Sequence, residues 1–398
     1  MSGLDPALWL DRPGFRKLLG VLKAADGETR LVGGAVRDWL LGLPAADVDL
    51  ATRLRPDEVV AALQAQGLRA VPTGLAHGTV TAVVGNTPYE VTTLRRDVAS
   101  FGRHAEVAFT SDWQEDAARR DFTINALYAD PHSGEVVDYF GGLADLAARH
   151  VRFIGDPLTR IAEDHLRILR FFRFSARFGP DLDAPGLAAC AERANDLMAL
   201  SRERIRDELL KLLALPSPSA TLAAMLAHDI LKPVLPEMEA SRLPALTALI
   251  EAETQARVTP DGLRRLASLL PADPRLSAEI GGRLKLSNAE KSRLLHAATR
   301  EPVPDDPRAL AYALGPAATL DRLLLTGDPR APLWAGPLSA YTRPRLPVSG
   351  KDLIAMGLAP GPQVSRRLAE VEQRWIEAGF PADRNHAMAL TRDVLGLR

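Results

Sequence analysis

Asp47 and Asp49 are the residues whose spacing points most directly to chemistry. The run that contains them, Asp47-Val48-Asp49-Leu50, is typical of a β-strand, and side chains two apart on a strand face the same way. Two carboxylates in one small volume repel each other unless a cation or a shared proton neutralises them. Mg²⁺ suits such a pair, because it binds one or two carboxylates together with substrate phosphates. The sequence therefore predicts that Asp47 and Asp49 are catalytic and bind Mg²⁺.

Gly33 and Gly34 lie shortly upstream of this pair. They follow a short apolar run and precede a helical pattern, so they offer bare backbone N–H groups and the positive end of a helix dipole to an anion. A phosphate site next to a metal site predicts chemistry on a nucleoside triphosphate. Each feature also has an ordinary reading, as a turn or as a solvated acidic pair. A dinucleotide-dependent oxidoreductase is a rival enzyme class, but the GxGxxG spacing is missing.

The elements that must position these residues fall into two kinds. Residues 30–138 alternate short strands with helices, which predicts a mixed α/β domain. Within it, residues 79–93 are typical of a hairpin that turns at Gly85 and Asn86. Beyond Val151 the pattern is helical, with proline-rich breaks. We expect three segments: a catalytic domain (1–148), a helical neck (149–215) and a helical body and tail (216–398).

The bulk properties exclude several classes of protein. The chain has 398 residues, a net charge of −1 and a single cysteine, Cys190. It contains no apolar run of about 18 residues and no N-terminal signal pattern, so we expect a cytoplasmic protein that does not span a membrane. One cysteine excludes an intramolecular disulfide and fits a reducing compartment. Because the net charge is close to zero, any contact with RNA must depend on local basic patches.

The run GGAVRDWLLGLPAADVDLAT at residues 33–52 resembles the signature of the class II tRNA nucleotidyltransferase (CCA-adding) and bacterial poly(A) polymerase family. Three further runs resemble motifs of the same family: RRDFTINA (119–126), EDHLR (163–167) and SRERIRDEL (201–209). The resemblance implies an α/β, polymerase-β-like nucleotidyltransferase domain with a mixed sheet, followed by an all-α neck, body and tail. It also implies Mg²⁺-dependent, template-independent addition of C and A nucleotides from CTP and ATP to the 3′ end of tRNA, with release of pyrophosphate. The tail is assigned to tRNA binding by the same resemblance.

The motif matches imply a role for each candidate residue. Asp47 and Asp49 would hold Mg²⁺, as two ions about 3.5–4 Å apart, while Asp38 orients Arg37. The nucleotide-binding residues divide into those for the triphosphate (Gly34, Arg37), the nucleotide as a whole (Arg120), the base (Asp164, Arg167) and the rest of the pocket (Arg170, Arg173). In the RRDFTINA run we expect Asp121 and Asn125, four apart on a helix, to hold the sugar or brace the arginine. The motif at 201–209 is expected to brace the neck, with basic residues near RNA.

Asp164 and Arg167 lie in residues 160–174, which the pattern predicts to be one buried helix. The ordinary reading of its charged series is a helix with salt bridges between neighbouring turns. The more specific interpretation is that Asp164 and Arg167 recognise the base of the nucleotide. Cytosine and adenine both present an amino donor beside a ring-nitrogen acceptor, so Asp164 can accept from the first and Arg167 can donate to the second. Uracil and guanine reverse this order and would leave buried polar groups unpaired, which can discriminate by a factor of about 10⁴.

Three other features stay open. Residues 95–116 predict a long polar loop around Gly102, Arg103 and His104, and the family has a flexible loop there. Glu90, on a neighbouring strand, is a candidate third carboxylate of the metal site. His228-Asp229 invites comparison with HD phosphohydrolases, but no accompanying ligands are convincing, and a structural reading is favoured.

Several relatives carry the same motifs. Residues 74–81, GLAHGTVT, look like the CCA-adding form, and the extended basic segment and basic tail typical of poly(A) polymerases are missing. A poly(A) polymerase, an enzyme that adds only A or only CC, and a non-catalytic RNA-binding protein remain as alternatives. The pair Asp47 and Asp49 argues against the last of these. The oligomeric state stays open.

Overall fold

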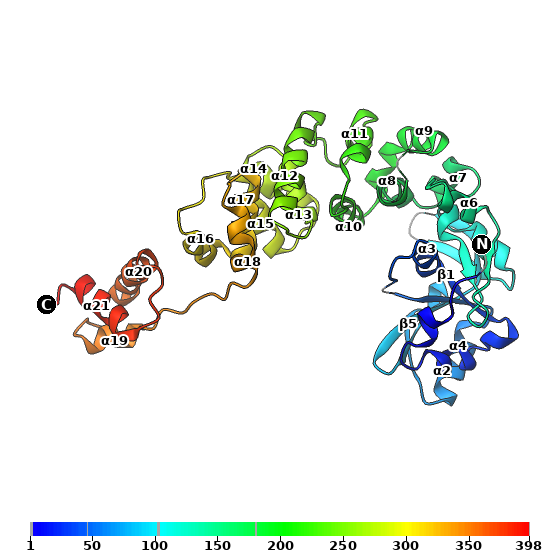
Figure 1. Cartoon of the computed structure of the whole chain (residues 1–398), viewed down its shortest axis with the longest axis horizontal. Coiled ribbons are helices and arrows are strands. Elements are labelled where there is room, and N and C mark those ends of the chain that lie inside the picture. The colour runs from blue at the N-terminus through cyan, green and yellow to red at the C-terminus, as the bar shows by residue number, and fades with distance from the viewer. Residues whose placement is uncertain (1–2, 46, 102–103, 180, 398) are drawn as a thin grey trace. The chain divides into compact units, whose positions relative to one another are not determined.

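The computed structural model describes residues 3–45, 47–101, 104–179 and 181–397. The chain divides into two compact units, residues 1–236 and residues 237–398 (Figure 1). This division is coarser than the three predicted segments, whose boundaries stay predictions.

A seven-stranded mixed sheet forms the centre of the first unit, with the strand order β3-β4-β5-β2-β1-β8-β9. The pairing of β2 with β5 is parallel, and all the other neighbours are antiparallel. The predicted mixed sheet is therefore confirmed. Its strands are β1 (Thr29–Val32), β2 (Asp49–Thr52), β3 (Arg69–Gly74), β4 (Thr79–Val84), β5 (Thr87–Thr93), β8 (Leu127–Ala129) and β9 (Val136–Asp138).

The predicted hairpin is also confirmed, with β4 and β5 joined by two residues. Gly85 and Asn86 both have positive φ, 55° and 66°, as a two-residue turn that follows the right-handed twist of its strands requires. The helices around the sheet are α1 (Ala7–Leu10), α2 (Phe15–Val21), α3 (Gly34–Leu40), α4 (Pro56–Ala65), α5 (Trp113–Ala118) and α6 (Gly142–Ala147), with short 3₁₀ turns at η1 (Ala24–Asp26), η2 (Leu75–His77) and η3 (Thr123–Asn125).

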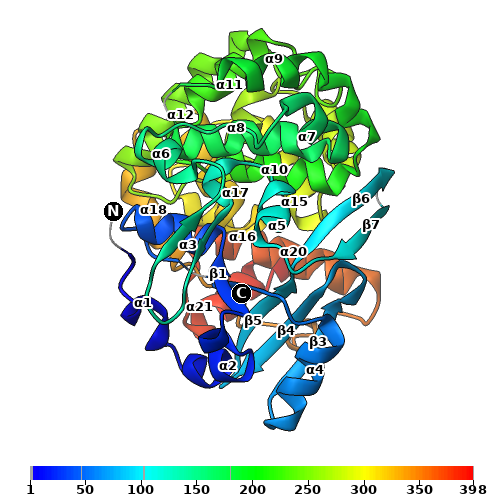
Figure 2. The ribbon, with the colours of Figure 1, turned by 90° about the vertical axis from the view of Figure 1, so that its right-hand side faces the viewer.

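The expectation of a loop at residues 95–116 is wrong. Strands β6 (Arg95–Phe101) and β7 (His104–Phe109) pair with each other as an antiparallel ribbon, and Figure 2 shows this ribbon next to α5. The strands were missed because the run RRDVASF at residues 95–101 shows no regular apolar alternation in the sequence. Gly102 and Arg103 lie outside the described residues, and movement of this segment stays a prediction.

Two local assignments also need correction. Strand β2 begins at Asp49, so Asp47 precedes the strand instead of lying on it. The segment from Asp121 to Asn125 ends in the 3₁₀ turn η3 and is not part of an α-helix.

The neck helices pack directly on the sheet domain within the first unit. Phe122 contacts the rings of Phe153, Phe171 and Phe174, which places α8 against the RRDFTINA segment. Helices α10 and α11 pack on α8, as the green part of the ribbon shows in Figure 1. The helices of this part are α7 (Pro157–Glu163), α8 (Leu166–Phe178), α9 (Ala184–Glu192), η4 (Ala194–Ala199), α10 (Arg202–Leu213) and α11 (Ser219–Ala227).

The single helix predicted over 160–174 is broken. Helix α7 ends at Glu163, Asp164 is extended with φ −152° and ψ 105°, and α8 begins at Leu166. The break turns Asp164 out of the helical register, so its direction could not be derived from helical spacing.

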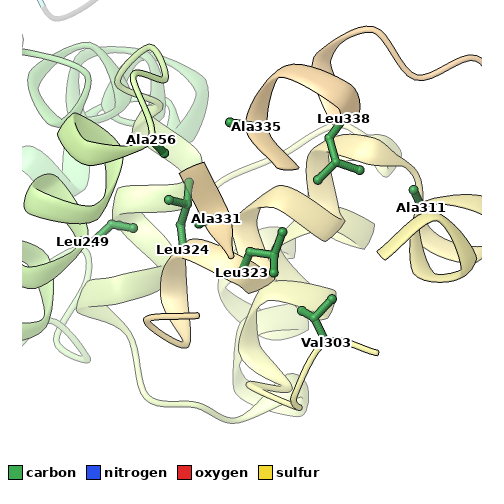
Figure 3. Packing of buried hydrophobic residues seen from close by; sticks show 9 residues of the cluster. All are labelled: Leu249, Ala256, Val303, Ala311, Leu323, Leu324, Ala331, Ala335 and Leu338. Carbon is green, nitrogen blue, oxygen red and sulfur yellow. The ribbon is translucent and has the colours of Figure 1, made fainter. Parts of the chain in front are cut away.

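The second unit is helical throughout its described residues. A core around Leu249, Leu323 and Leu324 holds α12 and α17 together (Figure 3), and Trp375 lies in a separate core near the C-terminus. No described helix combines the length and the apolar character needed to cross a bilayer. The helices are η5 (Ala240–Arg242), α12 (Leu243–Gln255), α13 (Gly262–Leu269), α14 (Pro274–Arg283), α15 (Asn288–Ala298), α16 (Pro307–Leu314), α17 (Pro316–Leu325), α18 (Ala331–Ser339), α19 (Gly350–Ala355), α20 (Pro362–Glu377) and α21 (Arg384–Leu395).

Candidate active site

Asp47 and Asp49 line the same cavity. Val48 and Leu50 are buried, whereas Asp49 is half-buried and Asp47 is exposed. The cavity has a volume of about 430 Å³, and Glu90 of the neighbouring strand β5 also lines it. Both aspartates therefore line the same cavity, as the sequence predicted, although only Asp49 belongs to the strand.

The electrostatics of this cavity favour a cation. Burial raises the pKa of Asp49 to about 6, with Glu90 and Asp47 acting in the same direction and Arg120 against it. Within the described part of the chain, no cationic side chain forms an ion pair with any of these three carboxylates. Hard carboxylate oxygens without a counter-charge are the donor set that a divalent cation such as Mg²⁺ takes.

Glu90 does not complete a protein-only metal site. Among the residues that the structure describes, no three histidine, cysteine or acidic side chains gather closely enough to hold an ion. A bound cation would therefore take Asp47 and Asp49 together with oxygens from a substrate, the arrangement that Mg²⁺ commonly adopts with phosphates. We leave Glu90 out of the ligand set.

A second cavity of about 430 Å³ begins at Asp49 and extends to the neck helices. Seven of the predicted site residues line it: Gly34, Arg37, Asp49, Arg120, Asp164, Arg167 and Arg170. Gly33 contributes backbone to its wall with φ 73°, a conformation that side chains with a Cβ rarely adopt. Arg119 and Phe174 also line it and were missed. One cleft therefore connects Asp49, a residue predicted to bind the metal ion, with the residues predicted to bind the nucleotide.

Arg37 is held rigidly on α3. Its guanidinium donates to Asp38 from Nε at 2.9 Å and from Nη2 at 2.8 Å, and it also donates to Asn125. It lies over the ring of Phe178 at 4.4 Å, and burial lowers its pKa. Asp38 also accepts from Arg177 at 3.0 Å. Asp38 is therefore placed where it can orient Arg37, and Arg37 presents a fixed positive charge to the cleft.

Asp116 organises the arginines of the RRDFTINA segment. Its Oδ2 accepts from Arg120 Nη2 at 3.0 Å and from the Tyr128 hydroxyl at 2.7 Å. Its Oδ1 accepts from Arg119 Nε at 2.8 Å and from the backbone N–H of Arg95 at 3.2 Å. Burial acts to raise the pKa of Asp116, but Arg120 and Arg119 lower it below its usual range. The spacing of Asp116 four residues before Arg120 was the available signal for this contact.

Asp164 and Arg167 line the cleft but are held by different partners. Arg204, from the motif at 201–209, donates to both oxygens of Asp164 at 2.8 and 3.1 Å. Arg167 donates to Glu163 at 2.5 Å and to the backbone carbonyl of Arg119 at 2.8 Å. Each side chain of the proposed base-reading pair is therefore oriented independently. The motif at 201–209 was expected to brace the neck, and the contact of Arg204 with Asp164 is one specific way in which it can do so.

Arg170 and Arg173 both lie near Glu208 and the Phe174 ring, but their closest partners differ. Arg170 donates from Nε to Asp121 at 2.8 Å, and Asp121 also accepts from Asn125 at 3.0 Å. Arg173 instead donates to Glu208 at 2.5 Å and does not line the cleft. The helical step from Arg170 to Arg173 thus turns the second arginine towards α10, and its nucleotide-binding role stays a prediction.

The Asp121–Arg170 pair should make stability depend on pH. Burial acts to raise the pKa of Asp121, but Arg170 and Asn125 lower it overall. A depressed folded-state pKa stabilises the protein above the unfolded value of about 3.9, and this is lost as the pH falls towards the folded pKa. We expect Asp121→Asn to lower the free energy of unfolding at pH 7 by about 2–4 kcal/mol, because Arg170 loses its hydrogen-bonded carboxylate and keeps only the more distant Glu208, at 3.9 Å.

Urea unfolding at pH 7, 5 and 3.5 measures this effect. The difference between Asp121→Asn and the unmodified chain should shrink below pH 4. Asp207→Asn, which changes an exposed carboxylate paired with Arg206, is the matched control and should shift unfolding little. A deficit of equal size at every pH would contradict the assigned ion pair.

His228 and Asp229 do not build a metal site in the described structure. Both side chains are exposed, and Asp229 pairs with Lys232 at 3.2 Å. The structural reading of this dipeptide is therefore kept.

Residues 29–152 match the family model of the "Poly A polymerase head domain", and residues 182–242 match the "Probable RNA and SrmB- binding site of polymerase A". The chain is 34% identical to "CCA tRNA nucleotidyltransferase 1, mitochondrial" of Mus musculus, covering 94% of this chain and 89% of that protein. It is 33% identical to the "CCA-adding enzyme" of Lacticaseibacillus paracasei, covering 97% and 98%.

The fold is similar to the crystal structure of the Bacillus stearothermophilus CCA-adding enzyme in complex with CTP. The TM-score is 0.73 at 27% identity, covering 96% of this chain and 98% of the other. The predicted fold class, a mixed-sheet nucleotidyltransferase domain followed by helices, is confirmed. From its motifs, its fold and these relatives, the chain belongs to the family of CCA-adding tRNA nucleotidyltransferases and poly(A) polymerases.

Proposed function

We propose that this protein adds C and A nucleotides from CTP and ATP to the 3′ end of tRNA, without a nucleic-acid template and with release of pyrophosphate. The observation that carries the proposal is the single cleft that joins Asp49 to Asp164 and Arg167. Chemistry at the α-phosphate and selection of the base can then take place on one bound nucleotide. The relatives named as CCA-adding enzymes cover nearly the whole chain, which supports the same activity.

Asp47 and Asp49 would hold Mg²⁺, which supplies activation of the terminal 3′-hydroxyl and charge stabilisation of the leaving pyrophosphate. In the reaction, the 3′-hydroxyl of the tRNA loses its proton to solvent and its oxygen forms a bond to the α-phosphorus. The bond from that phosphorus to the bridging oxygen of pyrophosphate breaks. Arg37 and Arg120 supply fixed positive charge to the phosphates. Because Asp38 and Asp116 hold them before substrate arrives, little reorganisation is needed during the reaction.

The protein itself would select the base. Asp164 would accept from the exocyclic amino group that cytosine and adenine share, and Arg167 would donate to the neighbouring ring nitrogen. Both residues already line the cleft and are oriented by Arg204 and Glu163. Uracil would place a carbonyl oxygen against the Asp164 carboxylate, which leaves two acceptors facing each other and costs binding energy.

Poly(A) polymerase activity and A-only or CC-only addition are the alternatives. A direct test offers tRNAs that end before the CCA sequence, after its first C or after its second C, each with CTP, ATP or both. With both nucleotides present, we expect each substrate to be extended to a complete CCA end and no further. CTP alone should give CC from the shortest substrate, and ATP alone should complete only the tRNA that ends after its second C. Long homopolymers from ATP would favour a poly(A) polymerase. Products that always lack the C or the A steps would favour a partial enzyme, and no incorporation would overturn the proposal.

The cytoplasm remains the compartment that we propose. Cys190 is buried, and burial raises the pKa of its thiol. A protein whose single cysteine is unpaired and unreactive does not depend on oxidising conditions.

A further inference from the structure

A cavity of about 350 Å³ lies within the second unit and shares no lining residue with the active-site cleft. Its walls come from the start of α12, from α13 and from the end of α17. Leu249 and Leu324 line it and belong to the core in Figure 3, so the walls are parts of a packed structure. The volume falls within the range of small-ligand sites.

Two arginines supply the charge of this cavity. Arg300 donates from Nη2 to the backbone carbonyl of Ala267 at 2.6 Å, which holds its guanidinium in place. Its Nη1 is buried and has no hydrogen-bond partner. Arg242 also lines the cavity and is half-exposed, so it lies where the cavity meets the surface. Burial and the proximity of Arg242 both lower the pKa of Arg300.

Among the residues that the structure describes, no acidic side chain lines this cavity. Within the described residues, neither Arg242 nor Arg300 forms an ion pair. Asp321 acts electrostatically on Arg300, but it already accepts from Arg264 at 2.7 Å and from Arg293 at 2.8 Å. Two like charges in one cavity are unfavourable without a counter-ion. This excess of positive charge is the reverse of the situation at Asp47 and Asp49, and it favours the binding of an anion.

We propose that Arg242 and Arg300 bind a backbone phosphate of the RNA substrate. A guanidinium matches the oxygens of a phosphate in geometry and charge, and the buried Nη1 of Arg300 would gain the partner it lacks. RNA is the source of phosphate favoured here, since the sequence match to an RNA-binding model ends at Arg242. The identification of the ligand as RNA rests on the proposed function. The cavity and its positive charge are observed independently of that function.

Binding of 5′-fluorescein-labelled tRNA to the full chain, without CTP or ATP, tests this assignment. Fluorescence anisotropy between 50 and 300 mM KCl gives the Kd and its dependence on salt. We expect Arg242→Gln to weaken binding by about 5- to 10-fold and to reduce the slope of log Kd against log salt by about 1, the value for one lost phosphate contact. Arg300→Lys, which keeps the charge but loses the planar guanidinium, should weaken binding in the same direction.

Arg275→Gln is the matched control, because Arg275 is an exposed arginine of the same unit on α14 without a side-chain contact in the described structure. Equal binding by Arg242→Gln and Arg275→Gln would overturn the proposal. Calorimetry with inorganic phosphate and with pyrophosphate covers the other source of the ligand chemistry. Free-anion binding that Arg242→Gln abolishes, with tRNA affinity unchanged, would also overturn it.

The kinetics separate this proposal from the proposed function. At saturating tRNA, Arg242→Gln should incorporate CTP at the rate of the unmodified chain, with only the KM for tRNA raised. A chain that binds tRNA through Arg242 but incorporates no nucleotide would contradict the proposed function and leave the phosphate site standing. Incorporation by Arg242→Gln with an unchanged KM for tRNA would contradict the phosphate site and leave the proposed function standing.

Discussion

Asp47→Ala and Asp49→Ala are each expected to reduce incorporation of CTP into tRNA by at least about 10³-fold. The reason is that the two carboxylates are the only acidic groups that we assign to the catalytic ion. Loss of metal-assisted charge stabilisation costs several kcal/mol in the transition state, and each 1.36 kcal/mol is tenfold in rate. Single-turnover rates at saturating CTP and tRNA measure the effect on the chemical step.

The fold should survive these changes. Asp47 is exposed, and Asp49 carries a pKa raised to about 6 by burial and by neighbouring acids, so neither charge stabilises the protein without metal. Asp57→Ala is the matched control, since Asp57 is an exposed carboxylate on α4 of the same unit. Thermal unfolding of all three variants separates loss of chemistry from loss of structure. Retained turnover in Asp47→Ala would remove the metal assignment.

Asp164→Ala should relax the choice of base more than it weakens binding of the triphosphate. The preference for CTP over UTP, measured as the ratio of kcat/KM values, is expected to fall by about 10²-fold or more, because the acceptor that rejects the uracil carbonyl is gone. The KM for CTP should change less, since Arg37 and Arg120 lie on other segments and keep their partners, Asp38 and Asp116.

Arg204 provides a graded comparison for this test. It donates to both oxygens of Asp164 and does not line the cleft. Arg204→Gln should therefore lower the CTP preference part of the way, by letting the Asp164 carboxylate move. An unchanged preference in Asp164→Ala would count against selection of the base by the protein.

The local parts of the site could be predicted from the sequence. Asp47, Asp49, Gly34 and Arg37 lie within one continuous motif, where short-range spacing determines direction. The hairpin at Gly85 and Asn86 was predictable for the same reason, because its turn chemistry is local.

Contacts between distant segments could not be predicted in this way. Arg204 reaches Asp164 across 40 residues of sequence, and Arg170 reaches Asp121 across 49. These pairs depend on the packing of α10 on α8 and of α8 against the RRDFTINA segment, which local periodicity does not predict. The extended backbone at Asp164 was missed for a related reason, since the charged and apolar residues on both sides of it continue the helical pattern.

A crystal structure of the full chain with CTP and Mg²⁺ tests the central claim most directly. We expect the ion at Asp47 and Asp49 next to the α-phosphate, with the amino edge of the same cytosine against Asp164 and Arg167. A nucleotide whose base lies away from these two residues, or whose phosphates lie away from both aspartates, would contradict the account.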